Sequence, residues 1–194
     1  QMSAGESAPI GDRARAAVSE SQMTMPDILA RPHQVAEGLW DGGLTHPAGT
    51  ALWSASIPGS LFSPQHLQVL AMYNFLAFTS AVFTIQVQTT QFQSGKLTAT
   101  AFPLTTPGEV LGTMVGFSER ANWKMPGNHY VDLDAGACTS ATLRVPFTAI
   151  SRMLRPTRFA SSDYTGTFML GVHNELRSVA TPTAHWTIFV SFEG

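Results

Sequence analysis

The stretch Phe83–Pro103, FTIQVQTTQFQSGKLTATAFP, carries the clearest strand pattern in the chain. Apolar and polar residues alternate in two runs, first over Phe83–Gln88 and then over Lys96–Ala101. Because successive side chains of a strand point to opposite faces, each run predicts a strand with one face on a core and one polar face. Gly95 supplies backbone freedom at the predicted connection, and Pro103 ends the second strand because proline cannot donate a ladder hydrogen bond. We therefore expect this stretch to form a β-hairpin.

Further elements are expected on both sides of this stretch. Pro64–Phe75 has apolar residues at helical spacing after a Ser63-Pro64 start, so it predicts the one convincing helix of the chain. The other strand candidates are Val35–Trp40, Gly49–Ile57, Tyr130–Asp134, Ser140–Phe147, Thr167–His173 and His185–Phe192. Together with the first two runs, they predict about eight strands with long connections, which is typical of an antiparallel jelly roll or another β-sandwich.

The first 32 residues differ from the rest of the chain. They show no helical or strand periodicity and contain few large apolar groups, so we expect an extended arm over 1–32 and a single domain over 33–194. Acidic and basic residues nearly balance in this arm, so it is not the polybasic kind that binds phosphates strongly. Gln1 is not an initiator methionine, and we expect the chain to be processed from a longer precursor or recorded in part.

The chain is poor in charge for its length. Only 12% of its 194 residues are Asp, Glu, Lys or Arg, against about 25% in an ordinary soluble domain. Since charge normally keeps a monomer soluble, we infer that neighbouring molecules cover much of the surface. The net charge of −2 argues against a protein whose whole surface binds nucleic acid. A lone cysteine, Cys138, excludes an internal disulfide framework, and no apolar run approaches the roughly 20 residues that span a membrane.

Residues that could carry chemistry form no recognisable catalytic motif. Asp132 and Asp134 share one strand face, which suits a calcium site or, more often, a solvated pair of carboxylates. No nucleophile elbow and no phosphate-binding loop is present, so we expect no enzyme and no cofactor. The six histidines lie in six different elements, and no two of them have the spacing of metal ligands. The sequence therefore predicts no metal site at these histidines, which are His33, His46, His66, His129, His173 and His185.

Taken in order, these elements resemble the capsid proteins of picornavirus-like positive-strand RNA viruses. The matching segments are Ala30-Arg31-Pro32, GTALWSASIP over 49–58, the stretch over 83–103, PGNHYVDLDAGACTSATLRVPF over 126–147, TGTFMLGVHNEL over 165–176 and HWTIFVSFEG over 185–194. The resemblance implies an eight-stranded jelly roll with two four-stranded sheets, whose strand orders are B-I-D-G and C-H-E-F. On that mapping the two strands over 83–103 are D and E, and the helix follows the second strand.

The resemblance also implies a function. A capsid protein of this kind is a structural subunit that assembles with other capsid subunits, in the host cytoplasm, into an icosahedral virion around single-stranded RNA; a host receptor is a further partner of such shells. Four arginines fall close together in the sequence, and we interpret them either as contacts to an adjacent subunit or to RNA, or as side chains of a solvated loop: Arg144, Arg152, Arg155 and Arg158.

One other function remains open from the residues alone, and a third fails on a missing motif. A secreted carbohydrate-binding jelly roll would explain the tryptophans as sugar-stacking residues, namely Trp40, Trp53, Trp123 and Trp186. A cupin-type enzyme would need a His-x-His metal pattern, which the sequence lacks.

Overall fold

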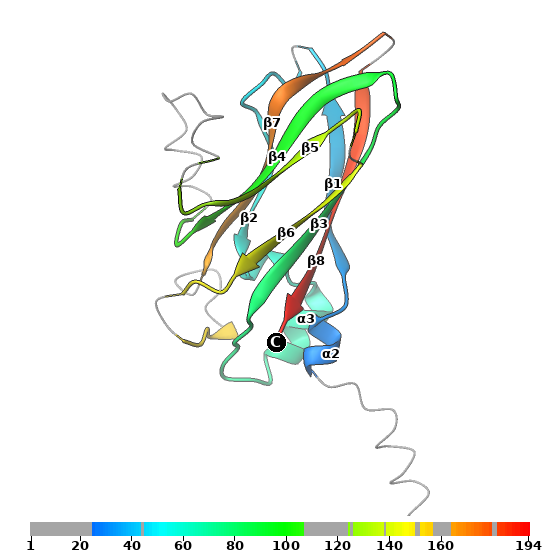
Figure 1. The fold of residues 1–194 in the computed structure, drawn as a ribbon. Helices are drawn as coiled ribbons and strands as arrows, with labels where there is room; N and C mark the ends of the chain where they lie inside the picture. Colours follow the sequence, from blue (N-terminus) through cyan, green and yellow to red (C-terminus); the bar gives the residue numbers. More distant parts are fainter. Residues whose placement is uncertain are drawn as a thin grey trace, which may run out of the picture.

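The structure is a computed structural model that describes residues 25–43, 45–106, 124, 126–137, 139–149, 152–156, 164–179 and 182–194. Eight antiparallel strands form two four-stranded sheets that enclose one core (Figure 1). The first sheet has the order β1-β8-β3-β6, with β1 at His33–Asp41, β8 at Thr183–Glu193, β3 at Ser80–Gln88 and β6 at Ser140–Pro146. The second has the order β2-β7-β4-β5, with β2 at Ala51–Ile57, β7 at Gly166–Ser178, β4 at Gln93–Pro103 and β5 at His129–Asp134.

These strand orders are those of a viral jelly roll. Read along the chain, β1 to β8 correspond to strands B to I, so the two sheets are B-I-D-G and C-H-E-F. The predicted fold class and the predicted assignment of all eight strands are confirmed.

The predicted β-hairpin over Phe83–Pro103 is wrong. Its two strands, β3 and β4, lie in opposite sheets, and residues 89–92 connect one sheet to the other. The alternation itself is correct, because Phe83, Ile85, Leu97 and Ala99 are all fully buried. Alternation determines which face of a strand is buried but not which strand it pairs with. Here the two apolar faces meet the same core from opposite sides.

Gly95 has a different role from the predicted one. It lies inside β4, not in the connection, and a Cβ there would sit 2.8 Å from the ring of Trp40 and 2.9 Å from the carbonyl oxygen of Glu175. Trp40 comes from β1 in the other sheet and is fully buried. Glycine at position 95 therefore allows the two sheets to approach closely around this indole ring.

The helices are short. Helix α3, Pro64–Leu70, begins where the sequence predicts, with Ser63 Oγ accepting a hydrogen bond from the His66 amide at 3.2 Å. It ends five residues earlier than predicted, and the connection that follows it is held by two backbone hydrogen bonds of 2.8 Å between Leu76 and Leu154. A 3-10 turn, η1 at Gly59–Leu61, precedes it.

Helix α2, Met25–Leu29, falls inside the stretch expected to be an extended arm. Leu29 is buried in the core cluster, and this tertiary contact explains a helix that sequence periodicity did not show. The rest of the expected arm, residues 1–24, lies outside the described residues.

Aromatic rings connect the sheets through the core. Phe83 of β3 stacks on Phe168 of β7, with ring centroids 4.2 Å apart and planes 14° apart. Toward the α3 end, Phe192 of β8 stacks on Phe62 at 4.8 Å and meets the edge of Phe78 at 5.1 Å. Such pairs add to the free energy gained from apolar burial alone.

The close fit around Trp40 leads to a test of the sheet packing. We expect Gly95→Ala to lower the free energy of unfolding by about 1–3 kcal/mol, because the added methyl group overlaps Trp40 and a backbone carbonyl that cannot move freely. Gly136→Ala is the matched control, since its Cβ would meet nothing closer than 3.5 Å. Urea unfolding followed by tryptophan fluorescence measures both; equal losses would contradict the role assigned to Gly95.

Candidate functional site

The structure places three of the four arginines that the sequence singled out. Arg144 on β6 is exposed, and its guanidinium lies 2.5 Å from Oε1 of Glu193 on β8. The Ser80 hydroxyl donates to the other oxygen of the same carboxylate at 2.5 Å. Arg144 is therefore engaged within the chain, in the kind of surface ion pair that contributes at most about 1 kcal/mol. Arg152 and Arg155 are exposed on either side of buried Leu154, and Arg158 lies outside the described residues.

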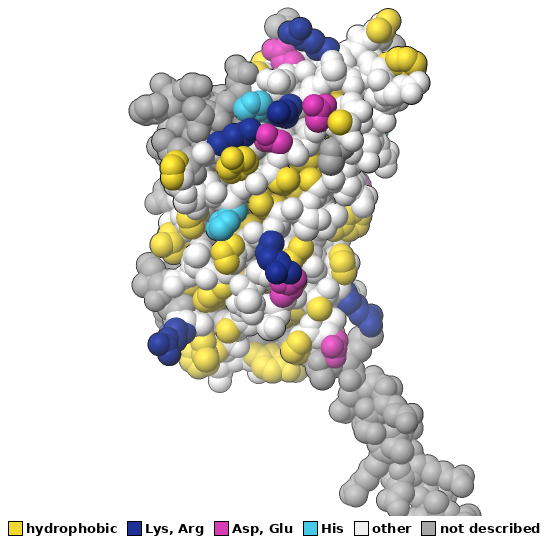
Figure 2. Space-filling model, in the orientation of Figure 1, with side chains coloured by type: hydrophobic (Ala, Val, Ile, Leu, Met, Phe, Trp, Pro, Cys, Tyr) yellow, Lys and Arg dark blue, Asp and Glu magenta, His cyan; other side chains and the backbone are white. Residues whose placement is uncertain are grey.

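Large apolar side chains are exposed at the same end of the molecule as α3. We call this region the base surface and define it by Leu67, Met72, Tyr73, Phe75 and Met153, with Arg152 and Arg155 beside them. The two backbone hydrogen bonds between Leu76 and Leu154 bring the connection after α3 next to the segment that carries both arginines. Figure 2 shows hydrophobic side chains gathered at this lower end, with a basic side chain at its edge.

The base surface includes a groove. Its volume is about 190 Å³, and its walls are almost entirely apolar, formed in part by Leu29 of α2, Leu70 of α3, Tyr73, Phe78 and Phe192. Met72 is 81% exposed and Phe75 is 54% exposed. Exposed apolar patches of this kind mark surfaces that other molecules cover.

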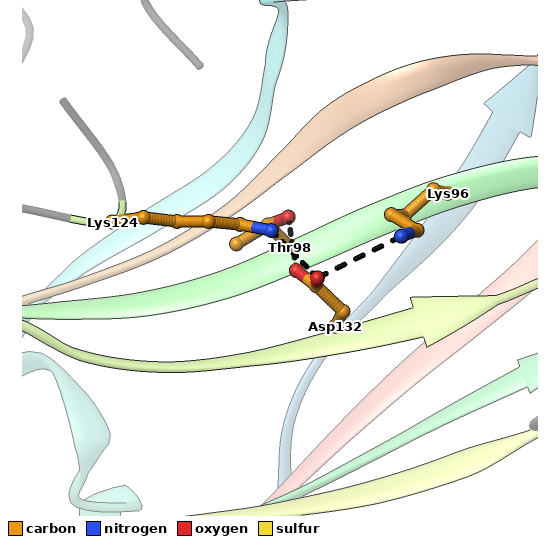
Figure 3. A network of polar contacts seen from close by, with 4 residues as sticks. All are labelled: Lys96, Thr98, Lys124 and Asp132. Atoms are coloured by element: carbon orange, nitrogen blue, oxygen red, sulfur yellow. Dashed lines mark hydrogen bonds and ion pairs between the residues drawn. The ribbon is translucent and has the colours of Figure 1, made fainter. Parts of the chain in front are cut away.

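A network of charged residues lies on the outer face of the second sheet (Figure 3). The Asp132 carboxylate on β5 accepts from the Lys124 ammonium at 2.6 Å and from the Thr98 hydroxyl of β4 at 2.8 Å, and Lys96 lies 3.8 Å away. Burial alone would raise the pKa of Asp132, but the hydrogen bonds from Lys124 and Thr98 and the charges of both lysines outweigh it and lower that pKa. The ammonium of Lys124 also lies 5.4 Å from the ring centroid of Tyr130.

This network argues against the calcium interpretation of Asp132 and Asp134. Two ammonium groups already neutralise Asp132, and Figure 3 shows them approaching its carboxylate from opposite sides. Asp134 accepts from the Gly136 amide at 3.1 Å, a local turn contact. Within the described ranges, no three His, Cys, Asp or Glu side chains come together as a metal site.

The structure joins two histidines that the sequence placed in unrelated elements. His33 begins β1 and His66 lies on α3, yet their ring centroids are 4.5 Å apart. No spacing rule could reveal this pair, because 33 positions separate its members. His46 is engaged separately, since its Nδ1 accepts from the Asp41 amide at 3.0 Å.

The three tryptophans within the described residues do not form a sugar-stacking surface. Trp40 and Trp186 are buried in the core, and Trp53 packs against Phe168 at 5.7 Å; Trp123 lies outside the described residues. A polar depression of about 600 Å³ lies at the Gly95 end of β4, and its described lining, which includes Lys96, Asp134, Glu175 and Arg177, holds no aromatic ring.

Comparison with known proteins identifies the same fold in virus particles. A chain in the structure of Triatoma virus is 23% identical, with a TM-score of 0.76 over 100% of this chain and 75% of that one. A chain of the Triatoma virus empty capsid is 24% identical, with a TM-score of 0.73 over 89% of this chain and 92% of that one. A chain of black queen cell virus is 22% identical, with a TM-score of 0.73 over 97% of this chain and 78% of that one.

No family model and no curated protein matches the sequence. At these levels of identity the likeness establishes the fold: the chain has the jelly roll of picornavirus-like capsid proteins. The resemblance expected from the sequence is confirmed at that level.

In the part of the chain that the structure describes, no helix is long and apolar enough to cross a membrane.

The Asp132 network predicts a pH-dependent contribution to stability. We expect Asp132→Asn to lower the free energy of unfolding at neutral pH by about 1 kcal/mol, because two lysines lose their shared counter-charge. The pKa of folded Asp132 is below the ordinary value of 3.8, so this contribution is present above pH 3.8 and is lost as the pH falls through the folded pKa.

Urea unfolding from neutral to acidic pH measures this difference between wild type and variant. The two curves of stability against pH should converge at the acidic end. Asp134→Asn, which removes a carboxylate on the same strand face but outside the lysine pair, is the control. A difference that stays constant down to strongly acidic pH would show that the carboxylate charge is not responsible.

Proposed function

We propose that this chain is a structural subunit of a non-enveloped icosahedral virus shell and not an enzyme. The observation that carries the proposal is the likeness of nearly the whole chain to chains of virus particles, including an empty capsid. Two features of the molecule support it independently of that likeness. The chain has few charges for its size, and it exposes a cluster of large apolar side chains on its base surface.

Those two features fit a subunit whose surface is shared with neighbours. Interfaces are enriched in Met, Tyr, Phe and Arg and depleted of Lys, Glu and Asp. The base surface has that composition, with Met72, Tyr73 and Phe75 next to Arg152 and Arg155. We propose that it contacts other jelly-roll subunits of the same shell, and that Arg152 and Arg155 pair there with carboxylates.

The remaining partners follow from the same proposal. A shell of this class encloses single-stranded RNA in the host cytoplasm, and the residues before α2 would extend from the domain to neighbouring subunits. Arg144 is less suited to RNA than the sequence suggests, because Glu193 already neutralises it.

The carbohydrate-binding alternative receives little support. Trp40, Trp53 and Trp186 are needed for the core and its border. Sugar binding by stacking requires exposed aromatic rings, and the polar depression at the Gly95 end has none in its described lining.

Electron microscopy tests the proposed function. The chain, produced together with the other shell proteins of the same virus, should be found in uniform closed particles. Removing residues 1–24 should reduce particle yield strongly, because the proposed arm contacts are lost, while circular dichroism and thermal unfolding of the domain from Met25 onward stay unchanged.

Two contrary results would test the role of the arm and the shell function separately. Closed particles of normal stability without residues 1–24 would contradict the role of the arm but leave the shell function intact. A monodisperse monomer that binds glycans and never enters particles would contradict the shell function.

A further inference from the structure

Two imidazole rings from separate elements meet where the first strand begins. His33 opens β1, and His66 lies in α3; their rings are in edge-to-face contact, with centroids 4.5 Å apart and planes at 71°. The ring centroids of Phe62 and His66 are 6.3 Å apart in an edge-to-face arrangement. Phe62 in turn stacks on Phe192 of the core. The histidine pair thus connects the segment over η1 and α3 to the sheet edge.

The hydrogen bonding defines the tautomer of neutral His33. His33 Nε2 lies 2.7 Å from the carbonyl oxygen of Leu61. A carbonyl can only accept, so Nε2 carries the hydrogen, and Nδ1 of neutral His33 holds a bare lone pair. Nδ1 of His33 and Nδ1 of His66 are both buried, and neither has a hydrogen-bond partner in the described part of the chain. A hydrogen on either Nδ1 would therefore lack an acceptor.

Within the described residues, the one side-chain hydrogen bond of the two rings goes to a backbone carbonyl, and neither Nδ1 has a partner. Apart from His66, η1 and α3 carry no titratable or charged side chain. On β1, Glu37 accepts from Gln34 at 2.8 Å, and Asp41 lies at the far end of the strand. On β8, Glu193 is held by Ser80 and Arg144, and His185 pairs with Leu39 near the other end. Before β1, α2 and the following turn contribute Asp27 and Arg31.

We propose that His33 and His66 form an acid-sensitive latch, which holds η1 and α3 against the start of β1 while His66 is neutral and loosens when His66 is protonated. A proton added at the buried Nδ1 of His66 would find no acceptor there. A charge on either ring disfavours a charge on the other at this distance. The latch sits one residue after the stretch that the sequence predicts as an arm, so its opening would loosen the base of that arm.

The lowered pKa of His66 agrees with this geometry; burial is its largest cause and His33 is the second. Because the folded value is below the ordinary 6.5, the stabilisation is present above pH 6.5 and is lost as the pH falls through the folded pKa. The inference concerns the isolated chain and holds whether or not the chain builds a shell.

Amide hydrogen exchange on the wild-type chain, followed residue by residue by NMR at about pH 7.5 and about pH 5, tests the latch. Protection factors, which correct for the intrinsic effect of pH, should fall about tenfold for the amides of Leu61, Leu67 and Ala71. These amides form the internal hydrogen bonds of η1 and α3. Amides in the centre of β3 should keep their protection, and a segment that stays equally protected at both pH values would overturn the proposal.

A double variant removes the titration but keeps the contacts. His33→Gln retains a donor for the Leu61 carbonyl, and His66→Phe retains an aromatic ring beside Phe62. In this variant the pH-dependent loss of protection should vanish, whereas His185→Gln, at an exposed histidine of β8, should behave like wild type. An unchanged pH dependence in the double variant would contradict the latch.

If the double variant does not fold, the wild type still decides the question. NMR titration of the His66 ring should coincide in pH with the loss of protection over η1 and α3. Loss of protection at a pH where the His66 ring does not titrate would refute the assignment.

Discussion

The stacking of Phe83 on Phe168 is the contact on which the rest of the structure depends, because it joins the two sheets through their shared core. Phe83 projects inward from within β3 and Phe168 from near the start of β7, and both rings are fully buried. Gly95 permits the same close approach toward one end, where Trp40 fills the space between the sheets. With the sheets joined in this way, the connections must gather at the two ends of the sandwich.

The two ends differ in chemistry. At the Gly95 end, a polar depression carries charges of both signs, including Lys96 and Asp134. At the other end, α2, α3 and the connection after α3 surround an apolar groove and leave large side chains exposed. A domain that buries its core fully between two sheets has no structural need for such an exposed apolar end. This excess of apolar surface, with the low overall charge, supports the proposal that the chain works inside an assembly.

Much of the fold could be predicted from local pattern, since alternation and proline positions show directly in the sequence. The partner of each strand could not, because alternation over 83–103 is equally compatible with one sheet or two. The polar side chains of β4 also gave a wrong expectation of solvent exposure. Thr98 and Thr100 lie on the outward face of the strand, yet both are fully buried. The contacts of the candidate residues were least predictable, since Arg144 with Glu193 and His33 with His66 are brought together only by the tertiary fold.

Hydroxyl-radical footprinting with mass spectrometry, applied to the isolated chain and to assembled particles, tests most directly whether this jelly roll is a shell subunit that buries its base surface. Met72, Tyr73, Phe75 and Met153 are exposed in the single chain and react readily with radicals, so they should oxidise quickly there. The account predicts strong protection of all four side chains in particles. Equal oxidation of these residues in the isolated chain and in particles would contradict it.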